Sequence, residues 1–234
     1  MNIKGSTFLV TGGSAGIGKA TAKLLVEKGG KVAITGRDKT KLEKVAKEIG
    51  AFPINADVAV EGDVFKTYEL FLKQFGKIDC LVNNAGIGDA WNEITQLDMK
   101  AFHKVYDVNV FGAALMGSEA AKLFKKQNYG NIINIASTAG TKGFANGTVY
   151  ASSKFALRGM TQCWQADLRK YNVRVILVNP SEVTTAFGDK ERNERPEVKN
   201  KLRPLEIAHT IVSALEMDDR GFIPEVTVWA TNPF

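Results

Sequence analysis

The chain has 234 residues, of which 44% are hydrophobic and 24% charged, and its formal net charge is +6. These values are typical of one soluble α/β unit, so we expect residues 1–234 to form a single domain. No apolar stretch reaches the length of a membrane span, and lysines alternate with acidic residues along predicted helices, so we expect neither a membrane nor a nucleic-acid partner.

The start of the chain and its rarer side chains give few functional signals. The first five residues run directly into a predicted strand and leave no room for a secretory leader, so the cytoplasm is the expected location. Cys80 and Cys163 have no ligand spacing, and we expect both to be buried small residues. His103 and His209 stand apart from any acidic cluster. We therefore predict no metal site.

The first feature in chain order is the segment 7–18, in which a short apolar run is followed by four glycines within seven positions. This pattern predicts a buried strand, a sharp turn and a helix that begins near Lys19. Gly12 can adopt backbone angles closed to other residues, Gly16 allows close approach of a ligand, and Gly18 allows tight helix packing. Because a helix N-terminus attracts anions, the segment predicts a dinucleotide-phosphate site, with a glycine turn that binds nothing as the alternative.

The second predicted strand, residues 31–35, ends beside Gly36 and Arg37. A dinucleotide fold places the residue that reads the adenosine ribose at about this position, some 20 residues beyond the glycine loop. An acidic side chain would favour NAD, whereas the planar fork of Arg37 favours the 2′-phosphate of NADP. The alternative is that Arg37 is an ordinary exposed arginine. Asp38 or Thr40 is expected to cap the next helix.

Strands and helices then alternate to the end of the chain. This alternation predicts right-handed crossovers and a doubly wound parallel sheet with helices on both faces. We expect further strands at 51–58, 78–82, 131–136, 173–179 and 222–230, and helices at 61–75, 98–127, from 148 onward, and at 204–217.

Two features near the predicted carboxyl edge of this sheet indicate chemistry. Ser137 follows the fifth strand, and Tyr150 and Lys154 share one face of the next helix, so all three side chains can meet.

The charged loop 184–204 is too long for a mere connector and is a candidate substrate lid. Its side chains include Phe187, Arg192, Arg195 and Lys199, and together with Trp91 they do not specify a substrate.

Five motifs in this order resemble those of the short-chain dehydrogenase/reductase family, and the resemblance covers nearly the whole chain. They are Thr11-Gly-x-x-x-Gly-Ile-Gly18, Asn83-Asn-Ala-Gly86, Asn109, Ser137 with Tyr150-x-x-x-Lys154, and Asn179-Pro180 followed by Val183 and Thr185. The resemblance implies a seven-stranded Rossmann fold of strand order 3-2-1-4-5-6-7. It also implies an NADP(H)-dependent oxidoreductase that reduces a ketone or 3-oxoacyl group, similar to 3-oxoacyl-[acyl-carrier-protein] reductases.

The resemblance assigns four catalytic roles. Tyr150 exchanges the proton with the carbonyl oxygen, and Ser137 stabilises the charge that develops on that oxygen. Lys154 binds the nicotinamide ribose and, with the positive nicotinamide, is expected to lower the pKa of Tyr150. Asn109 holds a water of the proton relay.

Further positions match cofactor contacts of the family, with two departures. Ser181 stands where many members have glycine, and Ala15 stands where NADP users often have arginine, so Arg37 and Ser14 are expected to hold the 2′-phosphate with less help. The implied contacts are Gly12, Ser14, Gly16, Ile17, Gly18, Arg37, Asp57, Val58, Asn84, Ala85, Gly86, Tyr150, Lys154, Pro180, Val183 and Thr185.

Two alternatives stay open at this point. A catalytically silent NADP(H)-sensing protein could share the fold, although it would not need Ser137, Tyr150 and Lys154 together. An acidic acyl carrier could meet a basic cluster of Lys122, Lys125 and Lys126, which a solvated helix end explains equally well. The family resemblance further implies a homodimer or homotetramer built on the two long helices and the last strand.

Overall fold

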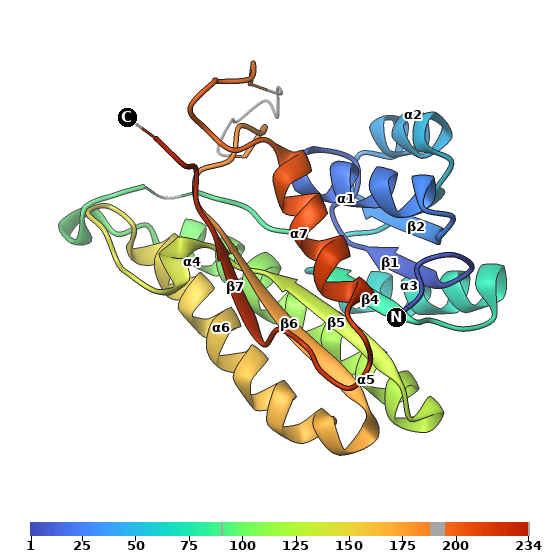
Figure 1. Cartoon of the computed structure of the whole chain (residues 1–234). Helices are drawn as coiled ribbons and strands as arrows, with labels where there is room; N and C mark the ends of the chain where they lie inside the picture. The colour runs from blue at the N-terminus through green and yellow to red at the C-terminus, as the bar shows by residue number, and fades with distance from the viewer. Residues whose placement is uncertain (90, 188–194, 234) are drawn as a thin grey trace.

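The computed structural model describes residues 1–89, 91–187 and 195–233. Within them, seven parallel strands form one sheet in the order β3-β2-β1-β4-β5-β6-β7, which confirms the predicted topology (Figure 1). The strands are β1 (Thr7–Val10), β2 (Lys31–Gly36), β3 (Phe52–Asn55), β4 (Cys80–Asn83), β5 (Gly130–Ile135), β6 (Val173–Pro180) and β7 (Glu225–Val228).

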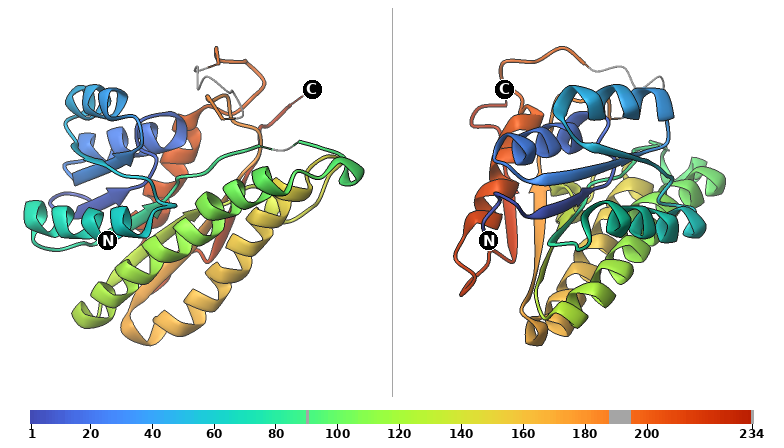
Figure 2. Two further views of the ribbon diagram at one scale, coloured as in Figure 1. Left: turned by 180° about the vertical axis from the view of Figure 1, so that it is seen from behind. Right: turned by 90° about the vertical axis from the view of Figure 1, so that its right-hand side faces the viewer.

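Helices cover both faces of this sheet (Figure 2). One face carries α1 (Gly16–Glu27), α2 (Lys39–Ile49) and α7 (Pro204–Glu216). The other carries α3 (Glu61–Phe75), α4 (Met99–Tyr106), α5 (Ala113–Gln127) and α6 (Thr148–Leu168). The architecture is therefore a doubly wound α/β fold of the Rossmann type.

Each inner strand supplies side chains to two hydrophobic clusters. In β1, Phe8 and Val10 pack with the α1 and α7 side, while Leu9 packs with the α5 side. Since successive strand residues point to opposite faces, a strand covered on both sides is apolar at every position. This explains why the buried strands read as continuous apolar runs rather than as alternating patterns.

The strand order reverses at β1, which pairs with β2 on one side and with β4 on the other. At such a switch point the connections leave in opposite directions and open a crevice beyond the carboxyl ends of the strands. The glycine segment after β1 and the segment after β4 therefore face the same space.

A buried amide network joins the sheet to the helices of one face. Asn83 and Asn134 are register partners on β4 and β5, and Asn83 Nδ2 donates to Asn134 Oδ1 (3.1 Å) and to the Ala113 carbonyl (3.1 Å). Asn134 Nδ2 donates to Thr161 Oγ1 on α6 (2.8 Å). Because buried polar groups are costly when unpaired, this network fixes α5 and α6 against the sheet.

The expected helix 98–127 is wrong as a single element. It consists of α4, a π-helical turn (Asp107–Gly112) and α5. The turn is packed tightly, since a Cβ added at Gly112 would lie 2.8 Å from the Val58 carbonyl oxygen. Such wider turns are frequent at functional sites, and this one contains Asn109.

Smaller expectations are corrected or decided by the structure. The third strand ends at Asn55, so Asp57 and Val58 lie in the loop beyond it, and the last strand is only four residues long. Of the two expected caps of α2, Asp38 is the one present, because its carboxylate accepts from the Lys41 amide (2.9 Å). Cys163 is exposed, whereas Cys80 is buried as expected.

None of the helices in the described ranges is both long enough and apolar enough to cross a bilayer.

Candidate active site

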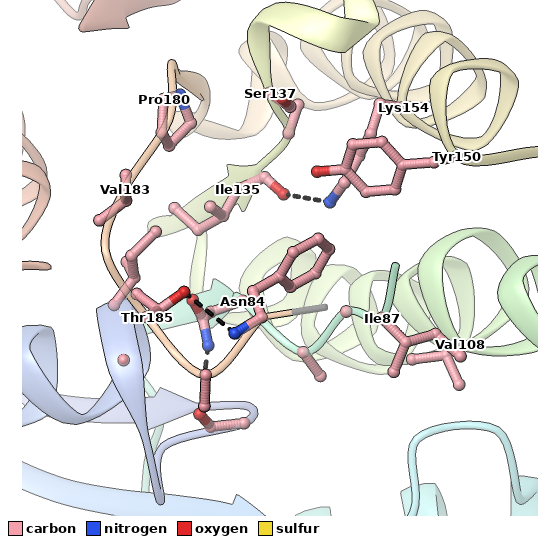
Figure 3. Close-up of a pocket in the computed structure, with 18 of the residues that line it drawn as sticks. Asn84, Ile87, Val108, Ile135, Ser137, Tyr150, Lys154, Pro180, Val183 and Thr185 are labelled. Atoms are coloured by element: carbon pink, nitrogen blue, oxygen red, sulfur yellow. Dashed lines mark hydrogen bonds between the residues drawn. The ribbon is translucent and has the colours of Figure 1, made fainter. Parts of the chain in front are cut away.

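A cavity of about 1220 Å³ opens at the carboxyl ends of the strands (Figure 3). Loops that follow β1, β2, β3, β4, β5 and β6 line it, and α6 contributes Tyr150 and Lys154. Of the predicted site residues, all line the cavity except Gly18 and Asn109. Residues that are up to about 170 positions apart in the sequence therefore meet in one cavity, because the parallel strands all end at the same edge of the sheet.

The glycine segment after β1 forms one wall and requires glycine at three positions. Gly12 (φ +64°) and Gly16 (φ +51°) occupy the left-handed region that glycine adopts without strain. A Cβ at Gly18 would lie 2.4 Å from the Gly12 carbonyl oxygen, so the close packing of α1 on the turn excludes any side chain there. The amino end of α1 faces the cavity through Gly16 and Ile17.

Thr11 joins the two loops at the switch point, a role that the motif pattern did not reveal. Its Oγ1 accepts from the backbone amides of Asn84 (3.0 Å) and Ala85 (2.9 Å). In return, Asn84 Nδ2 donates to the carbonyls of Thr11 (2.9 Å) and Gly12 (3.2 Å). These four bonds hold the ends of β1 and β4 in a fixed relation.

Asn109 lies just behind the cavity and is fully buried. Its Oδ1 accepts from the Ile87 amide (2.8 Å), and its Nδ2 donates to the Ile87 carbonyl (2.9 Å) and to Ser153 Oγ (3.1 Å). Ser153 Oγ in turn donates to the Tyr150 carbonyl (2.7 Å). The amide therefore connects the loop after β4 to α6, and Ser153 is a second positioning residue that the sequence did not reveal.

Ser137, Tyr150 and Lys154 meet at one end of the cavity, with Pro180 and Val183 facing them from the β6 side (Figure 3). Lys154 Nζ donates to the Ile135 carbonyl (3.0 Å) and lies 5.7 Å from the centre of the Tyr150 ring. Ser137 Oγ accepts from the Ala139 amide (3.1 Å), which fixes the hydroxyl at the end of β5. The predicted convergence of these three side chains is present in the structure.

Burial dominates the protonation of this group in the protein alone. Burial raises the pKa of Tyr150 to about 12, although a hydrogen bond with Ser137 acts to lower it. Burial also lowers the pKa of Lys154 to about 8. Loss of solvent penalises whichever form is charged, so the phenol stays neutral and the ammonium is weakened. The expectation that Lys154 lowers the pKa of Tyr150 is wrong for the protein alone.

The far end of the cavity carries the predicted ribose-reading residue. Arg37 is 52% exposed, and its Nη1 lies 3.8 Å from Asp57 Oδ2. Asn55 Nδ2 donates to the carbonyls of Gly36 (2.8 Å) and Arg37 (2.9 Å) and so shapes this loop. Lys41, which the sequence did not single out, lines the cavity here as well.

Part of the expected lid lies over the cavity. Val183 forms a parallel bridge with Leu202, and the Thr184 amide donates to the Leu202 carbonyl (2.9 Å). Phe187 and Arg195 line the cavity, whereas Lys199 is exposed and does not. Residues 188–194, which include Arg192, lie outside the described residues.

The comparisons with known proteins agree with this architecture. The family model for short chain dehydrogenases matches residues 6–196. The chain belongs to this family.

Across the parts of the chain that the structure describes, no three His, Cys, Asp or Glu side chains are grouped as a metal site.

Relatives of the short-chain dehydrogenase family resemble the chain over nearly its full length. An uncharacterized oxidoreductase of Staphylococcus saprophyticus is 34% identical, over 97% of this chain and 98% of the relative. An alcohol dehydrogenase from the archaeon Thermococcus sibiricus, solved with 5-hydroxy-NADP, has a TM-score of 0.89 at 27% identity over 97% of both chains. A 3-ketoacyl-(acyl-carrier-protein) reductase from Brucella melitensis, solved with NADH, has a TM-score of 0.89 at 28% identity over 99% of this chain and 100% of the other. The chain is an oxidoreductase of this family.

The tight contact at Gly18 gives a first prediction. We expect Gly18→Ala to weaken NADPH binding at least about tenfold, because the added methyl group displaces the Gly12 carbonyl and the cradle with it. Titration of NADPH fluorescence measures this. Gly62→Ala is the matched control, since a Cβ at Gly62 meets nothing within 4 Å. Equal affinity of both variants would show that the cradle does not hold the cofactor.

The lowered pKa of Lys154 gives a second prediction, on stability. Between pH 8 and 10.5 the unfolded chain holds a proton that buried Lys154 has lost, so the free energy of unfolding contributed by this residue rises with pH. We expect wild type to gain about 1 to 2 kcal/mol relative to Lys154→Met between pH 8 and 10. Denaturant unfolding of the apoprotein at several pH values measures the difference. Parallel curves for the two proteins would contradict the shift.

Proposed function

We propose that this oxidoreductase transfers a hydride between NADP(H) and a carbonyl compound or its secondary alcohol. The observation that carries the proposal is the convergence of Ser137, Tyr150 and Lys154 at one end of a cavity whose other wall is a glycine cradle. A binding protein without catalysis would need the cradle but not the three polar side chains. The roles given below to individual residues are part of this proposal.

The cavity fits a dinucleotide. Gly12 and Gly16 leave the approach to the amino end of α1 free of side chains, where a pyrophosphate is favoured. The cofactor supplies the hydride when bound. The residues that would hold it are Gly12, Ser14, Gly16, Ile17, Gly18, Arg37, Asp57, Val58, Asn84, Ala85, Gly86, Tyr150, Lys154, Pro180, Val183 and Thr185.

In the reductive direction, Tyr150 would donate its proton to the substrate oxygen. Its raised pKa keeps the phenol protonated at neutral pH, so the donor is present before the substrate binds. The Ser137 hydroxyl, oriented by the Ala139 amide, would donate a hydrogen bond to the same oxygen as negative charge develops on it. One proton moves from the phenol to the oxygen as one hydride reaches the carbonyl carbon.

Lys154 and Asn109 would support this step in different ways. Lys154 Nζ is anchored to the Ile135 carbonyl and has further N–H groups for the nicotinamide ribose and the phenol. Asn109 acts as a positioning residue, because its side-chain amide is bonded to Ile87 and Ser153 rather than directed into the cavity. The water that the family resemblance assigns to Asn109 stays a prediction.

The preference for NADP over NAD is supported by charge. Arg37 and Lys41 line the adenosine end, and Arg37 is weakly held because its contact with Asp57 is 3.8 Å long and largely solvated. Ser14 lies beside them, since its Oγ would be 3.0 Å from a Cβ added at Gly36. A guanidinium, an ammonium and a hydroxyl at one place suit a 2′-phosphate. The solved relatives differ in this respect: the Thermococcus sibiricus enzyme was solved with 5-hydroxy-NADP, and the Brucella melitensis enzyme was solved with NADH.

The structure disfavours the acyl-carrier alternative at the basic cluster. Lys122, Lys125 and Lys126 lie in the last turns of α5, which ends just before β5 begins. They are therefore at the amino edge of the sheet, whereas the cavity is at the carboxyl edge. A carrier bound to these lysines would hold its acyl group at the wrong end of the molecule.

A homo-oligomer is part of the proposal. Phe111 in the π-helical turn and Phe155 on α6 are exposed on the helical layer that the family resemblance assigns to a dimer interface. A second copy of the chain packed on this layer would remove the apolar surface of both side chains from water. The two hydrophobic clusters share one sheet, which supports a single domain over residues 1–234. The cytoplasmic location stays a prediction.

The proton donor gives a third prediction. We expect Tyr150→Phe to keep its affinity for NADPH and to lose at least about a hundredfold in kcat, since removal of a general acid typically costs 10² to 10⁴. NADPH oxidation with a panel of ketones, followed by absorbance, measures this. Tyr171→Phe makes the same chemical change beside Lys125 and Lys170, away from the cavity, and should not alter turnover. Tight cofactor binding without turnover of any carbonyl would favour the sensor alternative instead.

The adenosine end gives a fourth prediction. Arg37→Glu should reduce kcat/KM for NADPH at least about tenfold more than for NADH, because the new carboxylate repels the 2′-phosphate. Steady-state kinetics with both cofactors measure the ratio. Arg220→Glu, at a side chain that is almost fully exposed and outside the cavity, controls for net charge. Equal losses with both cofactors would show that Arg37 does not read the phosphate.

A further inference from the structure

Three aromatic side chains gather around the phenol of Tyr150, and we name Trp91, Phe144 and Phe187 the aromatic clamp. The ring centres of Trp91 and Phe187 lie 5.3 and 5.4 Å from that of Tyr150, and Phe144 lies 6.1 Å from Trp91. The three residues come from separate loops, after β4, after β5 and after β6. All three line the cavity.

Glycines shape these loops around the rings. A Cβ at Gly88 would lie 2.6 Å from Phe187 and 2.8 Å from Trp91, and a Cβ at Gly147 would lie 2.7 Å from Phe144. Any larger residue would displace a ring. The clamp is therefore a packed arrangement and not a set of side chains that happen to lie near one another.

The clamp nevertheless leaves much apolar surface uncovered. Trp91 is 43% exposed and Phe144 is 50% exposed, although both contact other aromatic rings. Burial of such surface stabilises a complex by about 25 cal/mol per Å². An apolar group placed against the clamp would cover it, and the hydroxyls of Ser137 and Tyr150 lie next to this surface.

Two charged groups near the clamp already have partners within the protein. Arg195 donates from Nε to the Thr185 carbonyl (2.9 Å), and Glu182 pairs with Lys201 (2.7 Å). The Thr141 hydroxyl donates to the Thr138 carbonyl (2.8 Å), and Lys142 is exposed at the rim. A sugar or a carboxylate packed against the rings themselves would lose water without gaining a polar partner from them.

We infer that the clamp selects an uncharged carbonyl compound, or its alcohol, that carries a bulky apolar ring system beside the reacting carbon. The inference rests on the proposed function and specifies its substrate class. Trp91 and Phe144 are then specificity-determining residues that contact the ring system, while Ser137 and Tyr150 contact the oxygen.

The test compares three probes with NADPH: 1-tetralone as the ring ketone, 2-butanone as the small ketone, and pyruvate as the charged one. We expect kcat/KM for 1-tetralone to exceed those for the other two at least about tenfold. Trp91→Ala and Phe144→Ala should each reduce the ratio of kcat/KM for 1-tetralone to kcat/KM for 2-butanone by about tenfold, because a contact with the ring system is removed. Phe65→Ala is the matched control, since this phenylalanine is 47% exposed on α3 and does not line the cavity.

Failure of the inference and failure of the proposed function give different results. Preference for pyruvate, or an unchanged ratio of 1-tetralone to 2-butanone in both clamp variants, would overturn the inference while the reductase stands. Absence of turnover with every carbonyl would overturn the proposed function. In that case calorimetric titration of 1-tetralone still tests the clamp: binding by wild type and Phe65→Ala but not by Trp91→Ala supports it, and equal binding by all three contradicts it.

Discussion

The contact between the ends of β1 and β4 is the constraint on which the site depends. A parallel sheet whose order reverses at β1 must place these two ends side by side, and Thr11 and Asn84 fix them with four hydrogen bonds. One end turns through Gly12 into α1, and the other continues through Gly86 toward the loop that carries Trp91. The glycine segment after β1 and the loop that carries Trp91 are thus positioned by a single junction.

Burial then sets the chemistry at the opposite wall. Tyr150 and Lys154 approach the sheet from α6, which Asn134 and Thr161 fix to β5. Removal from solvent makes the phenol harder to ionise and the ammonium easier to deprotonate, so before any ligand binds the phenol stays protonated and the pKa of Lys154 lies closer to neutral pH. A neutral phenol is ready to donate a proton. The low pKa of Lys154 is a stability cost that the fold tolerates at this position, as is common where function requires a buried ionisable group.

Most of the fold and of the cavity lining could be predicted from the sequence, because strand periodicity and glycine spacing are local signals with a direct geometric meaning. Tyr150 and Lys154 are one helical turn apart, and Ser137 directly follows a strand, so their convergence follows from the topology. The π-helical turn around Asn109 could not be predicted, since its sequence is compatible with a regular helix and the wider turn depends on packing against Val58 and Ile87. Thr11, Ser153 and Phe144 were missed for a similar reason. Their roles arise from contacts with segments far away in the sequence, and no local pattern reports such contacts.

The central claim is that one cavity holds the dinucleotide and presents its reactive end to Tyr150. A crystal structure of the chain with NADP⁺ tests this most directly. We expect the pyrophosphate at the amino end of α1 and the nicotinamide ring between the Tyr150 hydroxyl and the segment that begins at Pro180, with Lys154 bonded to the adjacent ribose. A nicotinamide bound away from Tyr150, or a dinucleotide bound outside the glycine cradle, would contradict the claim.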